Sequence, residues 1–304
     1  MKNLKDKYLH TDLASEGSKF PDSSLRGATY EEKSVNGNTV ARLHITDSEG
    51  AESLGKPIGR YITVGFTKCD ELCEKDRVSL IETVSNEIRT LAKSMCPDGI
   101  SGILVAGLGN RSITSDSLGP ICTDNINITR HLNLSESDKK YLPEISAIAP
   151  GVLAQTGIET VELIRGAAQS CQPSLIIVID ALASRSVGRL ASTVQLSDTG
   201  ISPGSGIGNH RKTINSETVG FPVMAIGVPT VVDSATLVLD ALERAGIEEY
   251  PDSLIPVLEE GMSFFVTLKD SDIAVSELSS ILFEALNLFF SSIGNASGIK
   301  GDCE

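Results

Sequence analysis

Residues 175–180 read Leu-Ile-Ile-Val-Ile-Asp, which is five consecutive aliphatic side chains followed at once by a carboxylate. A short, continuously apolar run of this kind is typical of a strand buried on both faces, as in a parallel sheet. An aspartate directly after such a run is costly to bury unless it is paired, hydrogen-bonded or protonated. Asp180 is therefore either the N-cap of a following helix or a functional carboxyl group, and both interpretations stay open.

Similar short apolar runs recur along the chain and alternate with helical patterns. The runs lie at 62–66, 103–106, 145–148, 175–179, 223–228 and 264–267. Apolar residues at spacings of three and four predict helices over 78–95, 158–168, 235–245 and 275–290. We therefore predict an α/β fold with a mostly parallel sheet flanked by helices. Residues 1–55 are polar, and we expect little core there apart from a strand at 39–45.

A second candidate carboxylate follows the strand predicted at 103–106. That strand runs into Gly107, Gly109 and Asn110, and the loop continues to Asp116. In open α/β sheets, binding sites form at the carboxyl ends of the strands, so Asp116 and Asp180 are expected at one edge. Two neighbouring carboxyl groups whose pKa values are pushed apart suit acid–base hydrolysis, one as proton donor and one as base. A dinucleotide site is not expected, because Ser112 breaks the required glycine pattern.

A glycine-rich segment at 198–209 is the third feature of interest. Its glycines are Gly200, Gly204, Gly206 and Gly208, and they suit either an anion-binding loop or a conformationally free one. The segment begins Asp-Thr-Gly, as in pepsin-like proteases, but those need two copies and this chain has one. Asp198 and Asp233 remain candidate supporting acids. Arg211 and Lys212, beside His210, are interpreted as a solvated basic spot.

Composition excludes several other classes of function. The 304 residues carry a net charge of −14, which argues against nonspecific nucleic-acid binding and against anionic membrane surfaces. Aromatic residues make up 4% and tryptophan is absent, so little is available to stack on single-stranded bases. The longest apolar run, at about 221–232, is too short to span a bilayer. The six scattered cysteines are expected to be reduced cytosolic thiols, and no metal site is expected from them.

Taken together, the loop motifs resemble those of the germination proteases, the spore endopeptidases of endospore-forming bacteria. The resemblance runs in order through most of the chain, and the segment 197–209 is its most specific part. The motifs are Gly107-Leu108-Gly109-Asn110, Thr114-x-Asp116-x-Leu118-Gly119-Pro120, Ala149-Pro150-Gly151-Val152, Ile179-Asp180-Ala181-Leu182-Ala183, Ser197-Asp198-Thr199-Gly200 and Gly227-Val228-Pro229-Thr230.

This resemblance implies an atypical aspartic endopeptidase that degrades small acid-soluble spore proteins during germination. It implies that Asp116 and Asp180 are the two essential aspartates, and that no cofactor is needed. The implied fold is similar to that of hydrogenase maturation endopeptidases, with smaller accessory elements at about 20–75. A homotetramer in the cytoplasm of the forespore or spore core is expected, without direct contact to nucleic acid or membrane.

The resemblance also implies a role for the N-terminal segment as a processing site. Residues 11–16 are similar both to the family's processing site and to the sites cut in its substrates. Self-cleavage is expected between Asp12 and Leu13, which would make residues 1–12 a propeptide and 13–304 the catalytic domain. Two alternatives stay open: a metal-dependent endopeptidase that uses the same carboxylates, and an inactive homologue that binds spore proteins.

Overall fold

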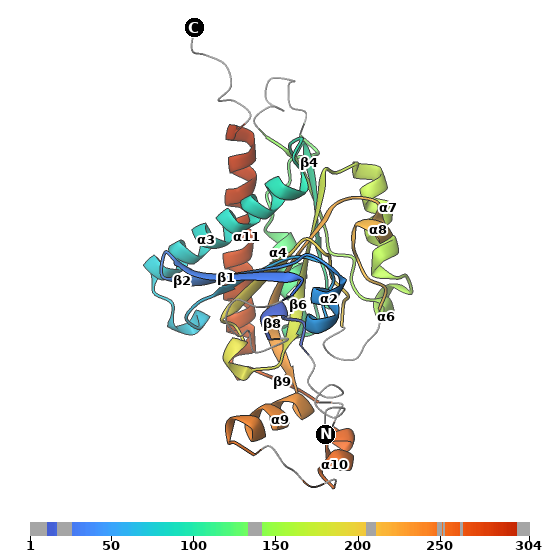
Figure 1. Cartoon of the computed structure of the whole chain (residues 1–304). Helices are drawn as coiled ribbons and strands as arrows, with labels where there is room; N and C mark the ends of the chain where they lie inside the picture. Colours follow the sequence, from blue (N-terminus) through green and yellow to red (C-terminus); the bar gives the residue numbers. More distant parts are fainter. Residues whose placement is uncertain are drawn as a thin grey trace.

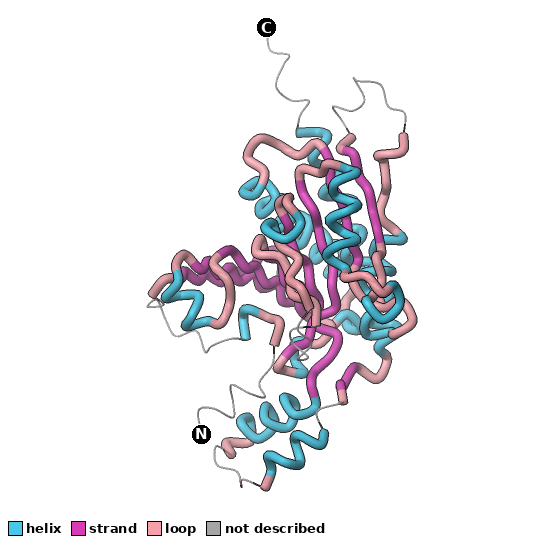
Figure 2. The backbone as a smooth tube through the Cα atoms, turned by 90° about the vertical axis from the view of Figure 1, so that its right-hand side faces the viewer, coloured by secondary structure: helices cyan, strands magenta, loops and turns pink. Residues whose placement is uncertain are grey.

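The computed structural model describes residues 11–16, 26–132, 142–204, 211–247, 251, 253–261 and 264–296. Within them one nine-stranded sheet carries helices on both faces (Figures 1 and 2). The strands are β1 (Ala28–Val35), β2 (Asn38–Ile45), β3 (Gly59–Gly65), β4 (Gly102–Gly107), β5 (Glu144–Ile148), β6 (Leu175–Ser184), β7 (Thr193–Ser197), β8 (Val223–Asp233) and β9 (Phe265–Thr267). The α-helices are α2 (Ser48–Leu54), α3 (Glu74–Met95), α4 (Leu118–Asp124), α6 (Leu153–Thr156), α7 (Thr160–Cys171), α8 (Ser216–Val219), α9 (Ser234–Arg244), α10 (Leu254–Gly261) and α11 (Ser271–Ala296).

The sheet is mixed, and its parallel part is one half of it. The strand order is β1-β2-β3-β7-β8-β6-β4-β5, and β9 pairs with the far end of β8. The ladders β4–β5, β4–β6 and β6–β8 are parallel, whereas β1–β2, β2–β3, β3–β7, β7–β8 and β8–β9 are antiparallel. The α/β fold is confirmed, and the expectation of parallel strands holds for the four strands from β5 to β8 in this order.

Two apolar layers bury the central strands from both sides. Ile177 of β6 packs in a cluster with Leu282 of α11, together with side chains of α3 and α4. Val178, the next residue, packs in a second cluster with Ile164 of α7. Successive strand residues point to opposite faces, so a strand covered on both faces needs apolar residues at every position. This explains the uninterrupted aliphatic run before Asp180.

Helix α11 is the long central support of one face (Figure 1). By length and composition alone its segment Ser271–Ile293, with a mean hydropathy of 1.5, could cross a membrane. In this fold 56% of the most apolar window is buried, against α3 and α4 among others. The spacing of apolar residues predicts a helix at 275–290, but no long uninterrupted apolar run marks this helix, because serines and other polar residues separate its apolar residues. Its burial suits a core helix.

The N-terminal strands extend the sheet and hold a small core of their own, which the polar composition of residues 1–55 does not predict. Leu43, Ile45, Leu54 and Tyr61 are buried together. Strand β1 was not expected either, because its side chains are mostly exposed and polar. It forms by pairing along its whole length with β2.

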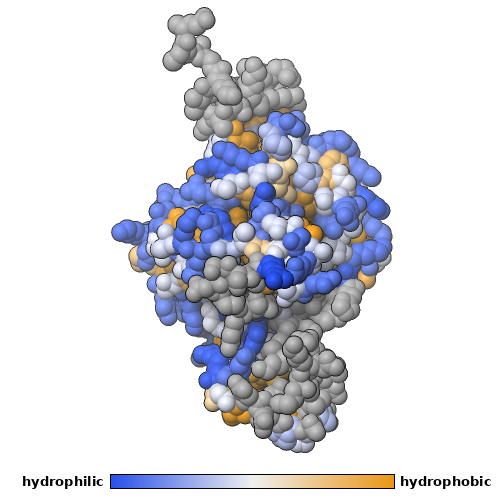
Figure 3. Space-filling view, viewed as in Figure 1, coloured by the Kyte–Doolittle hydropathy of each residue, from blue (hydrophilic) through white to orange (hydrophobic). Residues whose placement is uncertain are grey.

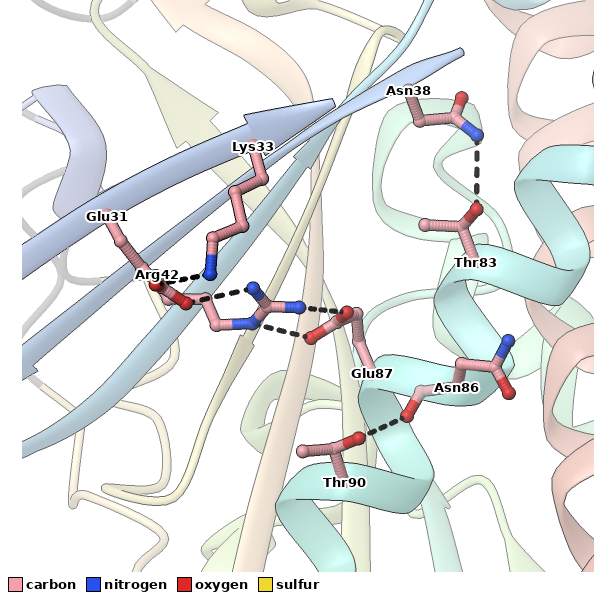
Figure 4. A network of polar contacts seen from close by, with 8 residues as sticks. All are labelled: Glu31, Lys33, Asn38, Arg42, Thr83, Asn86, Glu87 and Thr90. Carbon is pink, nitrogen blue, oxygen red and sulfur yellow. Dashed lines mark hydrogen bonds and ion pairs between the residues drawn. The ribbon is translucent and has the colours of Figure 1, made fainter. Parts of the chain in front are cut away.

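A polar network fastens this part of the sheet to helix α3 (Figure 4). Arg42 of β2 donates to both carboxylate oxygens of Glu87, at 3.1 and 2.5 Å, and to Glu31 at 3.0 Å. Asn38 donates to the hydroxyl of Thr83 at 3.2 Å. Glu87 is only 4% exposed, so its charge depends on the arginine.

Strands β6 and β8 both continue beyond the apolar runs that predicted them. Residues 181–184 of β6 and 229–233 of β8 were expected in loops, yet they stay in the sheet. The parallel register shifts between Leu182 and Ala183, opposite Pro229, which has no N–H to donate. No helix follows Ala181, so the N-cap interpretation of Asp180 is wrong.

The surface seen in Figure 3 is mostly hydrophilic, with scattered apolar residues. This is the expected surface of a chain with a net charge of −14.

Candidate active site

A cavity of about 250 Å³ lies where the loops after β4 and β5 meet the far ends of β6 and β8. Both predicted carboxylates, Asp116 and Asp180, line it, and so does Asp12 from the N-terminal segment. The cavity is formed by strands whose carboxyl ends point the same way, which is why residues far apart in the sequence converge here. The convergence of Asp116 and Asp180 follows the sequence prediction.

Asp180 occupies the middle of β6 and is 5% exposed. Its Oδ1 accepts a hydrogen bond from the backbone N–H of Ala181 at 3.0 Å. Its pKa is raised well above the ordinary value, first because burial removes the carboxylate from water. The negative charges of Asp116 and Asp12 raise the pKa further, while the Ala181 N–H and Arg211 oppose the rise. Asp180 is therefore the carboxyl group that most readily keeps its proton.

Asp116 ends a short 3-10 helix, η3 (Thr114–Asp116), and its Oδ2 accepts from the backbone N–H of Asn110 at 2.7 Å. Thr230 of β8 holds the same turn by donating to the carbonyl oxygen of Ser115 at 2.7 Å. Burial raises the pKa of Asp116, but the Asn110 N–H lowers it because that bond favours the ionised form. Gly109 has φ +112°, and a Cβ there would lie 2.0 Å from the Asp116 carbonyl oxygen. Only glycine fits this approach.

Arg211 supplies positive charge to the cavity. It lines the cavity, and its charge lowers the pKa of both Asp116 and Asp180. The sequence interpretation of Arg211 and Lys212 as one solvated spot is wrong for Arg211. It suits Lys212, which is 61% exposed and pairs with Glu162 at 3.2 Å. The position of Arg211 directly after a glycine-rich segment was the available signal.

The N-terminal segment lies along the cavity and is bound to strand β6. The backbone N–H of Asp12 donates to the carbonyl oxygen of Ala183 at 2.9 Å, and the N–H of Ala183 donates to Asp12 Oδ2 at 2.9 Å. Glu16 accepts from the backbone N–H groups of Arg185 and Ser186 at 2.7 and 3.1 Å. Leu13 is fully buried. A peptide segment with two acidic side chains is thus held at the edge of the carboxyl pair.

Of the other predicted loop glycines that the structure describes, one lines the cavity and the others do not. Gly204 lines the cavity, while Gly200 adopts φ +77° and closely approaches Ile214 instead. A Cβ at Gly107 would lie 2.1 Å from the carbonyl oxygen of Gly119, so this glycine lets β4 meet α4. Gly206 and Gly208 lie outside the described residues.

The two candidate supporting acids have structural partners away from the carboxyl pair. Asp198 accepts from the backbone N–H of Arg60 at 2.7 Å, which joins the ends of β7 and β3. Asp233 caps helix α9 by accepting from the N–H of Thr236 at 2.9 Å. In the described part of the cavity neither residue is among the lining side chains.

A metal ion at this site would need several histidine, cysteine or carboxylate ligands close together. Among the described residues, no group of three or more histidine, cysteine, aspartate or glutamate side chains is arranged to hold a metal ion. Of the two histidines that the structure describes, neither His44 nor His131 lines the cavity with Asp116 and Asp180.

The fold and the cavity define an α/β protein with a paired-carboxylate site beside a bound peptide segment. Residues 6–245 match the family model described as germination protease. The chain belongs to the germination protease family and is a peptidase. It is 42% identical to the germination protease of Caldanaerobacter subterraneus subsp. tengcongensis over 77% of this chain and 72% of that one.

Two further relatives are similar over comparable lengths. The germination protease of Priestia megaterium is 44% identical over 76% of this chain and 64% of its own. That of Clostridium perfringens is 39% identical over 87% and 81%, respectively. Among solved structures, a nickel–iron hydrogenase maturation protease from Thermococcus kodakarensis is 16% identical, with a TM-score of 0.31 over 54% of this chain and 96% of that chain.

Proposed function

We propose that this chain is a spore germination endopeptidase in which Asp116 and Asp180 hydrolyse peptide bonds by acid–base catalysis. We further propose that it is made as a zymogen and cuts its own chain between Asp12 and Leu13. Residues 1–12 would then be a propeptide, and 13–304 the mature enzyme. Its substrates would be small acid-soluble spore proteins, cut at sites similar to residues 11–16.

The observation that carries this proposal is the binding of residues 11–16 beside strand β6, with Asp12 in the carboxylate cavity. Asp12 bonds to Ala183, three residues beyond Asp180 on the same strand. Asp12 is held on β6 by one main-chain bond and one bond to its side chain, and residues 14–16 then form a short 3-10 helix. In peptide recognition, main-chain bonds give affinity and side-chain sites give specificity. The N–H groups that hold the carboxylates of Asp12 and Glu16 would favour acidic side chains at these two positions.

The electrostatics support different roles for the two aspartates. Asp180 keeps its proton because it is the more deeply buried group and faces two other carboxylates. Asp116 would be the ionised base, because the Asn110 N–H stabilises its charge. Asp116 takes a proton from water as the water oxygen bonds to the carbonyl carbon of residue 12. Asp180 gives its proton to the nitrogen of Leu13 as the C–N bond breaks, and the proton on Asp116 then restores Asp180.

The family suggests a location and an assembly as well. We propose a homotetramer in the cytoplasm of the forespore or spore core, which acts on proteins rather than on nucleic acid or membrane.

The test is to follow intact masses of the full-length protein and of a small acid-soluble spore protein during incubation at mildly acidic and neutral pH. The wild type should lose residues 1–12 and cut the substrate at similar sites. Asp116→Asn and Asp180→Asn should do neither while remaining folded. Asp233→Asn, which removes a helix-capping acid outside the described cavity lining, is the matched control and should retain cleavage.

Each remaining outcome has a distinct meaning. Cleavage that is lost with EDTA and restored by added metal would move the mechanism to a metal-dependent endopeptidase. Cleavage by either Asp116→Asn or Asp180→Asn would remove that residue from the mechanism. No cleavage by the wild type, together with binding of the spore protein, would favour the inactive homologue.

A further inference from the structure

The carbonyl oxygen of Asp12 accepts hydrogen bonds from two side chains that the acid–base pair does not use. Lys56 Nζ lies 3.1 Å from this oxygen, and Gln195 Nε2 lies 3.2 Å from it. Lys56 precedes β3 and Gln195 belongs to β7, so tertiary structure alone brings them to this atom. Asp12 is the residue before the proposed cleavage bond, which makes this oxygen the one that gains charge during hydrolysis.

Gln195 forms hydrogen bonds to the segment on both sides of the bond proposed to be cut. Its Oε1 accepts from the backbone N–H of Ala14 at 2.6 Å, while its Nε2 donates to the carbonyl oxygen of Asp12. The side chain belongs to a residue that is only 9% exposed. One amide therefore holds the residues on either side of Leu13.

Lys56 brings a positive charge to the same oxygen. Within the described residues its ammonium group donates to two backbone carbonyl oxygens, those of Thr11 at 3.3 Å and Asp12 at 3.1 Å. Burial lowers the pKa of Lys56, although Asp12 and Glu16 oppose this through their negative charges. A partly buried cation directed at peptide carbonyls has a stronger effect on them than it would in water.

Residue 12 lies between the carboxyl pair and these donors. Asp12 lines the cavity that contains Asp116 and Asp180, and it also lines a second cavity of about 220 Å³ that contains Lys56 and Gln195. Water activated in the first cavity would attack the carbonyl carbon from one side. The oxygen would meet its hydrogen-bond donors on the other.

We propose that Lys56 is a third catalytic residue, which with Gln195 stabilises the negative charge on the carbonyl oxygen of the residue before the cleaved bond. This inference rests on the proposed function. When the water oxygen bonds to the carbonyl carbon and Asp116 takes the proton, the electron pair of the carbonyl double bond moves to the oxygen that Lys56 and Gln195 hold. The pair returns when the C–N bond breaks and Asp180 protonates the leaving nitrogen.

The test compares self-cleavage rates of full-length variants by intact mass. Lys56→Met should slow the cleavage about 10²–10³-fold, the usual effect of removing one such donor. Lys56→Arg keeps a cationic donor and should recover most of that loss. Lys93→Met, at an exposed lysine near the end of α3, is the control and should cleave at the wild-type rate.

A second measurement separates catalysis from simple anchoring. Hydrogen exchange at the amide of Ala14 reports whether the segment stays bound to Gln195. A catalytic role predicts slow cleavage with the Ala14 amide still protected in Lys56→Met. If that variant does not fold, Gln195→Glu keeps an acceptor for Ala14 but loses the donor to Asp12, and it should also cleave slowly.

The outcomes separate this inference from the proposed function. Wild-type rates in Lys56→Met, or a loss of Ala14 protection as large as the loss of rate, would overturn the role of Lys56 alone. A wild type that does not cut between Asp12 and Leu13, like Asp180→Asn, would overturn the proposed function and this inference with it.

Discussion

Asp180 is held in surroundings that stabilise its protonated form at the expense of the folded protein. The residue is 5% exposed and faces the charges of Asp116 and Asp12. In the unfolded chain an aspartate loses its proton near pH 4. Above that pH the folded protein either retains the proton or buries a charge, and both are unfavourable. Active-site residues in natural proteins commonly lower the free energy of unfolding in this way.

Asp180→Asn should therefore raise the melting temperature. Because the pKa of Asp180 is raised in the folded state, this residue favours folding most below pH 4. As the pH rises toward the folded pKa, its contribution to the free energy of unfolding falls by about 1.4 kcal/mol per pH unit. The variant lacks this fall, so its advantage over the wild type should grow as the pH rises above 4 and should level off above the folded pKa of Asp180. Calorimetry at several pH values measures the difference, and equal melting temperatures throughout would contradict the raised pKa.

Arg211 would set the pH range in which the proposed carboxyl pair works. Its charge lowers the pKa of both aspartates, so Arg211→Gln should raise both. If Asp116 must be ionised and Asp180 protonated, the whole pH–rate profile for cleavage should move to higher pH. Lys212→Gln, at a neighbouring lysine that pairs with Glu162, is the control. An unmoved profile in Arg211→Gln would show that its charge does not act on the pair.

At the scale of elements, an ion pair helps to hold strand β2 against helix α3. Arg42 of β2 is the bidentate partner of Glu87 on α3, which is 4% exposed (Figure 4). Removal of one partner from a buried pair is costly because the other charge stays buried and unpaired.

Arg42→Met should lower the free energy of unfolding by about 3 kcal/mol, measured by urea denaturation. Glu31→Gln removes the exposed partner of the same arginine and should cost less than about 1 kcal/mol. Equal losses in the two variants would mean that burial of Glu87 does not control the energy of this network.

At the scale of the whole molecule, helix α11 contacts two helices that lie far from it in the sequence. It packs against α3 and α4 and closes one face of the parallel strands. Its apolar composition alone would also suit a membrane span. The burial pattern favours a core helix, because fully buried and well exposed leucines occur on the same helix.

Two leucines of α11 test this role in the purified protein. Leu282 is fully buried, so Leu282→Ala should cost about 3 kcal/mol of unfolding free energy. Leu288 is 42% exposed, and Leu288→Ala should cost less than about 1 kcal/mol. Similar small losses at both positions in water would argue against a core role for the helix.

The main helices and the central strands could be predicted from the sequence because their signal is local. The run 175–179 must be apolar when both faces are covered, and α3 shows its buried face at spacings of three and four. Strand β1 and the extensions of β6 and β8 could not be predicted in this way. Their pairing partners, rather than their own side chains, keep them in the sheet.

The same division applies to the site. Asp180 could be predicted as a candidate from the sequence because it directly follows an aliphatic run, where a carboxylate is costly to bury, and Asp116 because it lies in the loop after a buried strand. Lys56 and Gln195 carry no such local signal, since lysine and glutamine are ordinary surface residues. The only local signal for Arg211 is its position after the glycine-rich segment. Only the folded chain gives these polar groups their partners: β7 brings Gln195 beside Asp12, and the loop before β3 brings Lys56 to the same carbonyl oxygen.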